Sequence, residues 1–309
     1  MTVDVSIIIT AYNVESYIAR AIRSALDQSG PVVEVIVVDD CSTDGTWSVV
    51  SGISDARLKC FQLPQNGGPS VARNAGIAQA TGSWIAVLDG DDAFEQGRLE
   101  RCLARAKAAG ADIVVDNLSV IRENCGPVLP MFAPSQFSRT ATLDLAGFVA
   151  GNQSFMTGYG LGYLKPVFSA EFLRRHKLSY DPDIRIGEDY LIMAEALADG
   201  AVCAIEPTAG YRYTVRAGSI SHRLTRDDIL RISACDKKFL SRHTLNAAAM
   251  KAQRRREASI KEAYAFTLLV DALKKRSIKG VVEALFQCPA AVRHLWLPLK
   301  ARIGRVVKC

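Results

Sequence analysis

The sequence has no long hydrophobic run near its start and no basic segment to accompany one. Asp4 stands where a signal peptide would carry Lys or Arg, and the apolar run at 5–11 is too short for a secretory core or a membrane span. We therefore expect the 309-residue chain to stay inside the cell.

Motifs that depend on cysteine or glycine are also missing. The eight cysteines form no Cys-x-x-Cys pair and no even cluster, which indicates neither a zinc site nor a disulfide framework. No G-x-x-x-x-G-K-[ST] loop occurs, and the glycines at 158, 160 and 162 have the wrong spacing for a dinucleotide-binding G-x-G-x-x-G. These absences argue against a P-loop and against dinucleotide binding.

The composition is that of an ordinary globular protein, with 49% hydrophobic and 23% charged residues, but the charge is unevenly placed. Residues 250–309 contain 14 Lys or Arg against 4 Asp or Glu, whereas the first 249 residues contain 24 against 28. A mildly acidic body with a basic end argues against a protein coated for nucleic acid and favours contact with an anionic surface.

Strand and helix patterns alternate along the first half of the chain. A run rich in β-branched residues predicts a strand at 5–11, and the repeating pattern predicts further strands at 32–38, 57–63, 83–88 and 111–116. Apolar stripes between them predict a helix capped by Asn13 and further helices at 43–53, 70–79 and 96–108. This alternation predicts an α/β fold with a mostly parallel sheet covered on both faces. Mobile loops are expected at 118–165, and later helices at 190–197, 226–246, 250–276 and 278–287.

Acidic side chains follow two of the predicted strands, at the carboxyl ends where open sheets bind ligands. The Asp89-Gly90-Asp91 turn could hold a divalent cation that also binds phosphates, although such a pair equally suits a solvated turn. Asp39 and Asp40 could cap the next helix, or they could accept hydrogen bonds from a nucleobase or a ribose.

Other segments supply charges of both signs. Arg73 lies early in the helix that follows Gly67-Gly68, where it could neutralise an acid or touch a phosphate. Glu188 or Asp189 could deprotonate a hydroxyl, although both could simply cap the next helix. Cations and donors suited to a departing diphosphate, or merely to a charged strand and loop, are Arg212, Arg216 and His222.

Five segments together resemble glycosyltransferase family 2 in order and spacing over about residues 4–222. They are SIIITAYN at 6–13, VVDDCSTDGT at 37–46, NGGPSVARNA at 66–75, LDGDD at 88–92 and GED at 187–189. Each segment is weak evidence alone, and the five in register are specific. More loosely, the chain is similar to bacterial exopolysaccharide glucosyltransferases of the succinoglycan type.

The resemblance implies a GT-A fold and a metal-dependent, inverting transfer of sugar from a UDP-sugar. Asp40 and the backbone near Ala11 would hold the uracil and ribose. Asp91 would bind Mn²⁺ or Mg²⁺ on the diphosphate, with His222 as a second candidate ligand. Asp89 would contact the ribose or the donor sugar.

For the chemistry itself, the resemblance implies that Asp189 is the general base and that Glu188 helps to place the acceptor. Arg73, Arg212 and Arg216 would contact the donor. The proline that often follows the family's acidic motif is absent, with Gln96 near that place. This departure affects a helix start more than the chemistry.

The implied organisation is a catalytic domain at 1–222, with a nucleotide-sugar half at 1–117 and an acceptor half at 118–222, and a basic helical region at 223–309. The segment 290–309 mixes basic and apolar residues without an acid, so it could lie on an anionic membrane or pack as a helix on the body. Pro298 argues against one continuous helix. We expect peripheral contact with the cytoplasmic face of the inner membrane.

We therefore expect transfer of a sugar, glucose by the looser resemblance, to a saccharide or lipid-linked acceptor in surface polysaccharide assembly. A nucleotidyltransferase on a similar sheet would instead release pyrophosphate, and the absence of a glycine-rich basic loop near the N-terminus counts against it. A nonenzymatic sugar-nucleotide sensor or membrane scaffold is disfavoured by the presence of Asp40, Asp91 and Asp189 together.

Overall fold

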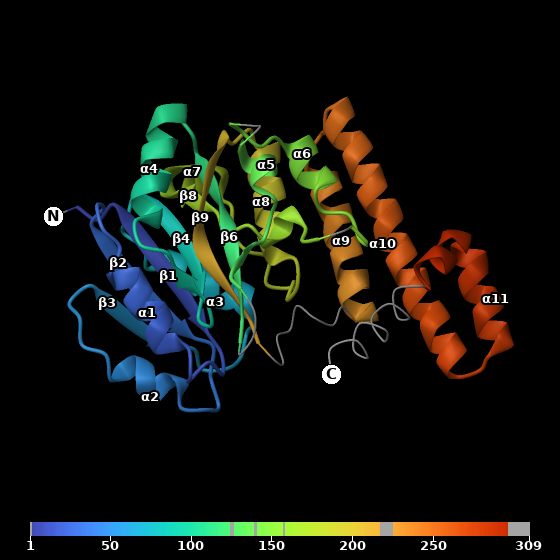
Figure 1. Ribbon diagram of the computed structural model, residues 1–309, viewed down its shortest axis with the longest axis horizontal. Coiled ribbons are helices and arrows are strands. Elements are labelled where there is room, and N and C mark those ends of the chain that lie inside the picture. The colour runs from blue at the N-terminus through green and yellow to red at the C-terminus, as the bar shows by residue number, and fades with distance from the viewer. Residues whose placement is uncertain (1, 124–126, 139–140, 157, 217–224, 296–309) are drawn as a thin grey trace.

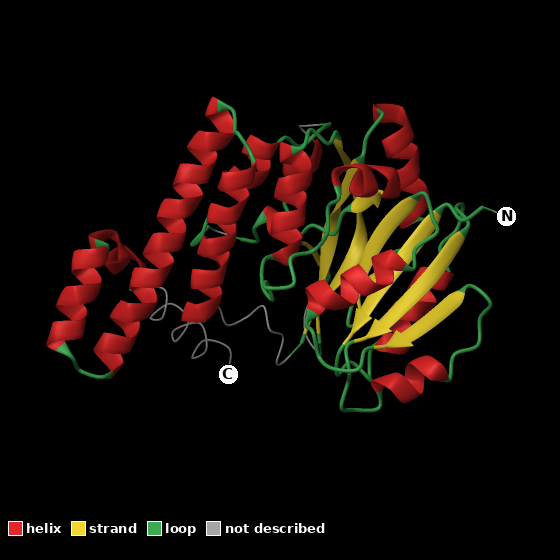
Figure 2. Ribbon diagram, turned by 180° about the vertical axis from the view of Figure 1, so that it is seen from behind, coloured by secondary structure: helices red, strands yellow, loops and turns green. Residues whose placement is uncertain are grey.

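The computed structural model describes residues 2–123, 127–138, 141–156, 158–216 and 225–295. Within these residues one nine-stranded sheet forms the body of the protein, and a group of helices extends from one side of it (Figures 1 and 2). The strand order is β3-β2-β1-β4-β8-β6-β9-β5, with β7 paired to β6.

Four parallel strands form the first part of the sheet, close to the ranges expected from the sequence. They are β1 (Val5–Ala11), β2 (Val33–Asp39), β3 (Leu58–Gln62) and β4 (Trp84–Asp89). β1 and β2 are buried along almost their whole length. Near-continuous Val and Ile runs are typical of parallel strands that helices cover on both faces.

Helices pack on both faces of these strands, and α2 (Thr46–Ser51) lies near one end (Figures 1 and 2). α1 (Ile18–Leu26) covers one face and α3 (Pro69–Ala78) covers the other, whereas α4 (Arg98–Ala109) packs against later strands of the sheet. A Cβ atom added to Gly76 of α3 would lie only 2.4 Å from Cγ2 of Ile8. The missing side chain therefore lets α3 approach β1 closely.

The expected helix cap at Asn13 is wrong. α1 begins at Ile18 after Tyr17, and Asn13 has a positive φ of 52°. Its side-chain oxygen instead accepts a hydrogen bond of 2.8 Å from the backbone N–H of Thr43. Asn tolerates this left-handed conformation, and here it ties together the loops that follow β1 and β2.

The second part of the sheet is mixed. β6 (Ile113–Arg122) runs parallel to β9 (Cys203–Val215), and β8 (Val167–Ser169) lies between β4 and β6, antiparallel to both. The short strands are β5 (Ala93–Phe94) and β7 (Leu129–Pro130). The strand expected at 111–116 is longer in the structure, because Asp116 and Asn117 are buried and β6 continues through them with a register shift.

The expected loop stretch at 118–165 also contains short helices. These are α5 (Pro134–Ser138), α6 (Leu145–Ala150) and the 3-10 turn η1 (Leu161–Tyr163). Their few residues carry too short an apolar pattern to be recognised from the sequence.

The remaining helices are α7 (Ala170–His176), α8 (Glu188–Ala198), α9 (Arg226–Arg242), α10 (Ala247–Lys274), α11 (Ile278–Gln287) and the 3-10 turn η3 (Pro289–His294). Arg256 of α10 joins this helical region to the body. Its guanidinium bonds the Asp236 carboxylate, donates to the carbonyl of Asn152 at 2.6 Å and lies over the Tyr190 ring. No helix within the described residues is long and apolar enough to cross a membrane.

Candidate active site

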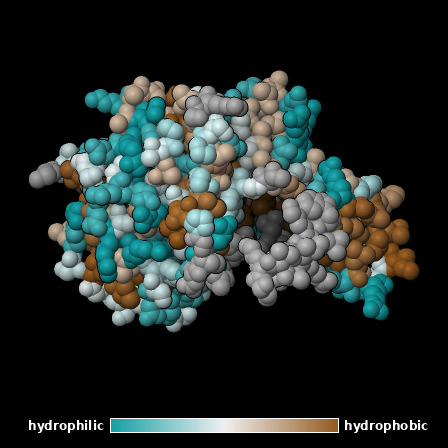
Figure 3. Space-filling model, viewed as in Figure 1, coloured by the Kyte–Doolittle hydropathy of each residue, from teal (hydrophilic) through white to brown (hydrophobic). Residues whose placement is uncertain are grey.

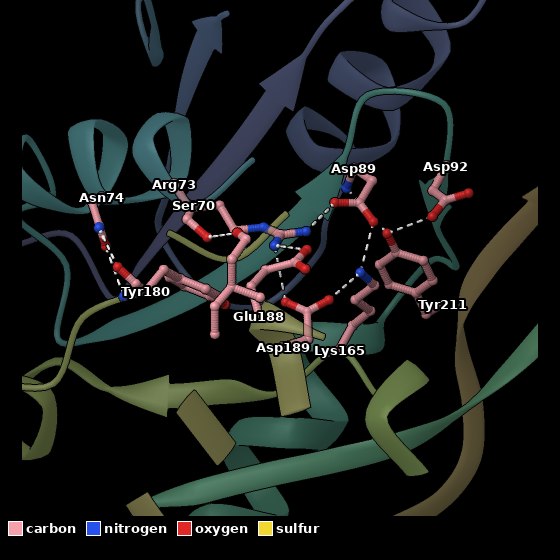
Figure 4. Close-up of polar contacts among 11 residues, drawn as sticks. Ser70, Arg73, Asn74, Asp89, Asp92, Lys165, Tyr180, Glu188, Asp189 and Tyr211 are labelled. Atoms are coloured by element: carbon pink, nitrogen blue, oxygen red, sulfur yellow. Dashed lines mark hydrogen bonds and ion pairs between the residues drawn. The ribbon is translucent and has the colours of Figure 1, made fainter. Parts of the chain in front are cut away.

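Three carboxylates from two distant parts of the sequence converge on two buried cations (Figure 4). Asp89 ends β4, whereas Glu188 and Asp189 begin α8. Arg73 of α3 and Lys165, just before β8, lie between them. The acids therefore come from the two motifs that the sequence had singled out, and they meet at the carboxyl end of a central strand.

Arg73 connects all three carboxylates. Its Nη2 donates to Asp89 Oδ1 at 2.7 Å, and its Nη1 donates to Glu188 Oε1 at 2.7 Å. Nη1 also lies 3.1 Å from Asp189 Oδ1. The guanidinium packs over the ring of Tyr180, and only 2% of the residue is exposed. Arg73 can thus hold both acidic motifs in one geometry.

One face of α3 also fixes the loop that leads into α8. Residues three and four apart share a helix face, so Ser70, Arg73 and Asn74 point the same way. Ser70 donates to the carbonyl of Ile184, and Asn74 exchanges two hydrogen bonds with the backbone of Tyr180 (Figure 4). The segment 66–75 therefore positions the acids at 188–189 as well as supplying the arginine.

Lys165 is the site residue that the sequence reasoning missed. Its Nζ lies 2.7 Å from an oxygen of Asp89 and 2.7 Å from an oxygen of Asp189. The Lys165 carbonyl accepts a 2.6 Å hydrogen bond from Arg98, which is itself paired with the buried Asp116. The available signal was a single charge within the apolar stretch 161–168. A charge in such a place is usually paired when buried.

The environments of these groups push their pKa values in different directions. Burial alone would raise the pKa of Asp89, but Lys165 and Arg73 hold it well below its ordinary value. Burial raises the pKa of Glu188 despite the Arg73 ion pair. Burial would lower the pKa of Lys165, and the carboxylates of Asp189 and Asp89 raise it instead. Neighbouring acids whose pKa values are shifted in opposite directions are typical of catalytic sites.

One carboxylate oxygen of Asp189, Oδ1, contacts Arg73 Nη1 as an ion pair at 3.1 Å without hydrogen-bond geometry. Oδ2 of Asp189 accepts from Lys165, whereas Oδ1 is buried and accepts no hydrogen bond within the described residues. A buried acceptor left without a hydrogen bond is costly, and such groups often have a catalytic reason. Oδ1 is therefore suited to receive a proton from a bound hydroxyl.

The two aspartates after Gly90 have different surroundings. Asp92 is buried, and it accepts hydrogen bonds from the Tyr211 hydroxyl at 2.8 Å and from the Thr214 backbone at 2.7 Å. The Asp91 side chain is 21% exposed, and its Oδ2 lies 2.7 Å from Arg216 Nε. Asp91 thus faces outward for a ligand, whereas Asp92 anchors the turn to β9.

Asp91 could bind a cation only if a bound ligand supplied most of the other coordinating atoms. No group of three or more His, Cys, Asp or Glu side chains in the described part of the chain could bind a metal by itself. Mg²⁺ commonly uses only one or two protein carboxylates and completes its shell with phosphates and water. His222, the other expected ligand, lies outside the described residues.

We expect Tyr211→Phe to destabilise the protein by about 1–3 kcal/mol, because removing the hydroxyl leaves buried polar groups without partners. That hydroxyl donates to Asp92 and accepts from the backbone N–H of Asp89. Urea unfolding of the variant would measure the loss. Tyr12→Phe, at an exposed ring, is the matched control and should be neutral. Equal stability of the two variants would contradict the anchoring role.

Asp40 is buried and binds the glycine turn. Its carboxylate accepts from Asn66 Nδ2 at 2.9 Å and from the backbones of Gly67 and Gly68 at 2.7 and 2.8 Å. Burial raises its pKa, although the two backbone donors oppose the effect. The Asp40 N–H donates to the carbonyl of Ala11 at 2.8 Å. The structure thus brings Ala11 and Asp40 together, and a carboxylate, which can accept about four hydrogen bonds, has capacity left beyond these three.

The remaining expected cations lie apart from the three-acid cluster. Arg212 forms a bidentate ion pair with Glu95, with hydrogen bonds of 2.5 and 2.8 Å, on the exposed side of β9. Arg216 pairs with Asp91 and packs over the ring of Tyr17. Arg216 is therefore placed beside the expected metal ligand, whereas Arg212 is not.

Comparison with known proteins finds a match over residues 6–172 to the family model described as glycosyl transferase family 2. The succinoglycan biosynthesis protein ExoO of Rhizobium meliloti is 46% identical over 98% of this chain and 87% of its own length. ExoU of the same organism is 35% identical over 94% of this chain and 84% of its own length. The Escherichia coli enzyme WfaP, a UDP-Glc:alpha-D-GlcNAc-diphosphoundecaprenol beta-1,3-glucosyltransferase, is 43% identical over 28% of this chain and 35% of its own length.

Two solved structures share the fold. S. aureus TarS in complex with UDP-GlcNAc matches with a TM-score of 0.65 and 22% identity, covering 91% of this chain and 79% of TarS. The mannosyltransferase PcManGT from Pyrobaculum calidifontis, in complex with GDP-Man and Mn²⁺, matches with a TM-score of 0.59 and 17% identity, covering 99% of this chain and 80% of PcManGT. At these sequence identities, the comparison shows that the fold is shared and does not extend to the substrates.

Proposed function

The chain belongs to glycosyltransferase family 2 and has a GT-A-type fold, and from this premise we propose that it transfers a sugar from a UDP-sugar with inversion. We propose glucose as the sugar and a lipid-linked saccharide as the acceptor, in exopolysaccharide biosynthesis. The names of ExoO, ExoU and WfaP support this choice. The single observation that carries the proposal is the convergence of Asp89, Glu188 and Asp189 on Arg73 and Lys165.

In the proposed reaction, Asp189 is the general base. Its Oδ1 takes the proton of the acceptor hydroxyl while that oxygen forms a bond to the anomeric carbon. The bond from the same carbon to the diphosphate breaks, and UDP leaves with the electron pair. A single displacement of this kind inverts the anomeric centre, so an α-linked donor gives a β-glycoside. Lys165 and Arg73 hold the carboxylate in place, and Glu188 helps to position the acceptor.

The donor side is formed by other residues. Asp40 and the backbone of Ala11 hold the uracil and ribose, and Asp89 contacts the ribose or donor sugar. Arg216, beside Asp91, stabilises charge on the departing diphosphate. A divalent cation bound by Asp91 would neutralise the same developing charge.

We propose that three regions of the chain have different functions. Residues 1–117 bind the nucleotide sugar, 118–222 bind the acceptor, and 223–309 form the basic helical region. Peripheral contact of this region with the cytoplasmic face of the inner membrane would bring the site to its lipid-linked acceptor.

UDP release from a panel of UDP-sugars, with membrane lipid extract as the source of acceptor, tests the proposal. One donor should release UDP with Mn²⁺ or Mg²⁺. Release of pyrophosphate from a nucleoside triphosphate would show a nucleotidyltransferase instead, and binding of UDP-sugar without turnover would favour a sensor or scaffold.

We expect EDTA or Asp91→Ala to lower UDP release by about 100-fold or more, because either change removes the cation that opposes the charge of the leaving group. Asp227→Ala, on α9 and outside the site, should retain full activity. Undiminished release in EDTA would refute metal dependence.

A further inference from the structure

α11 presents an apolar stripe to solvent. Ile278, Val282 and Phe286 are spaced four residues apart, so they share one face of the helix. They are 82%, 60% and 91% exposed, and Leu273 at the end of α10 is 47% exposed. Figure 3 shows the hydrophobic surface gathered over this part of the molecule. Isolated apolar residues on a surface need no explanation, but an ordered row of large ones indicates a partner.

The opposite face of α11 holds the helix in position. Ala284 is almost completely buried, and a Cβ atom added to Gly280 would lie 3.0 Å from Cβ of Ala272 on α10. Small residues therefore allow the two helices to pack closely. Because that face of α11 packs against α10, the large apolar side chains on its other face point away from the protein.

Basic residues border the stripe at the turn between α10 and α11. Lys274, Lys275 and Arg276 are consecutive and exposed, and none forms an ion pair within the described residues. Lys279 follows one turn later, 3.9 Å from Glu283. The other nearby acid, Asp271, is already paired with Arg226. The exposed charge next to the stripe is therefore predominantly positive.

We propose that residues 273–286, here named the α11 platform, dock on the surface of an anionic lipid bilayer. A helix that buries a row of large apolar side chains at the interface while cations meet acidic headgroups is the usual design for such binding. A second copy of the chain fits less well. A two-fold contact through the stripe would bring the basic residues of one copy close to the same basic residues of the other. The inference rests on the proposed function only for its purpose, which is access to a lipid-linked acceptor.

The platform differs from the segment that the sequence suggested. The expected membrane contact was 290–309, of which 296–309 lie outside the described residues. The platform precedes that segment and comprises the end of α10, the turn after it and most of α11. It combines both elements of interfacial binding, the apolar row and the cations, within 14 residues.

Sedimentation of the full chain with vesicles tests the proposal. Wild type should bind phosphatidylglycerol-containing vesicles and bind pure phosphatidylcholine vesicles much less. Ile278→Ser/Val282→Ser/Phe286→Ser should weaken binding to the anionic vesicles by about tenfold or more, because three apolar anchors are lost. Lys274→Gln/Lys275→Gln/Lys279→Gln should also weaken it and should reduce its dependence on salt. Phe61→Ser, at an exposed aromatic side chain on β3, is the matched control and should bind like wild type.

Absence of wild-type binding, or equal binding by wild type and the triple serine variant, would overturn the platform as a docking surface. A wild-type dimer that becomes monomeric in the triple serine variant without lipid would assign the stripe to a second copy instead. No sugar donor is needed for sedimentation. Failure here with intact UDP release would therefore remove only the docking proposal, whereas vesicle binding without any sugar transfer would count against the transferase proposal alone.

Discussion

Asp189→Asn should lower the rate of sugar transfer by about 10²- to 10⁴-fold, the usual contribution of a general base. The amide keeps the size of the side chain but cannot take the proton from the acceptor hydroxyl. Donor binding should change little, because the proposed contacts to uracil and ribose come from Asp40 and Ala11. UDP release in the presence of acceptor measures the first effect, and calorimetric titration with UDP measures the second.

The matched control for this substitution is Asp183→Asn. Asp183 lies in the same segment before α8, its side chain is exposed, and it is outside the cluster of charges. It should transfer sugar at the wild-type rate. Wild-type turnover by Asp189→Asn would show that another group removes the proton, and the base would have to be reassigned.

Lys165→Met should destabilise the protein by about 3–5 kcal/mol at neutral pH, because removing one partner of a buried ion pair leaves uncompensated charge. The methionine would leave Asp89 and Asp189 close together without the cation between them. Activity should fall as well, since the ammonium positions both carboxylates. Urea unfolding measures the first effect and UDP release the second. Lys237→Met, at an exposed lysine on α9, is the control and should be nearly neutral.

The destabilisation by Lys165→Met should depend on pH in a defined direction. The folded protein holds the pKa of Asp89 below its ordinary 3.8, so this stabilisation is present above pH 3.8 and is lost as the pH falls through the lower, folded-state value. The pKa of Lys165 is raised above its ordinary 10.5, so its contribution is present below pH 10.5 and is lost only as the pH rises through the raised value. The penalty should therefore be full at pH 7 and smaller near pH 3. A penalty that does not change between these values would indicate a packing defect rather than lost charge pairing.

The strands that carry the site could be predicted from the sequence, because strand formation depends largely on residues that are close together in the chain. Near-continuous apolar runs located β1, β2 and β4, and the rule for strand ends then placed Asp40 and Asp89 at the ligand-binding edge. The five-segment resemblance gave the family and the GT-A fold, and both are confirmed. The roles of the individual residues remain predictions.

The contacts that complete the site could not be predicted, because each joins distant parts of the chain. Lys165 has no motif, and it meets Asp89 across 76 positions of sequence. The pairing of Asp116 with Arg98 turns a polar strand end into a buried strand interior, which a hydrophobicity pattern cannot anticipate. The pairing of Arg212 with Glu95 likewise depends on the register between β5 and β9.

The placement of β8 has a consequence for protein engineering. Because β8 bonds to both β4 and β6, the two halves proposed to bind donor and acceptor share one continuous sheet. A chimera that joins halves from two transferases at residue 117 would cut β6 in mid-strand. A junction at Gly110, in the turn after α4, would leave β6 whole. It would, however, take Arg98 from one parent and its partner Asp116 from the other. New donor and acceptor combinations should therefore be sought among parents that carry both residues of this pair.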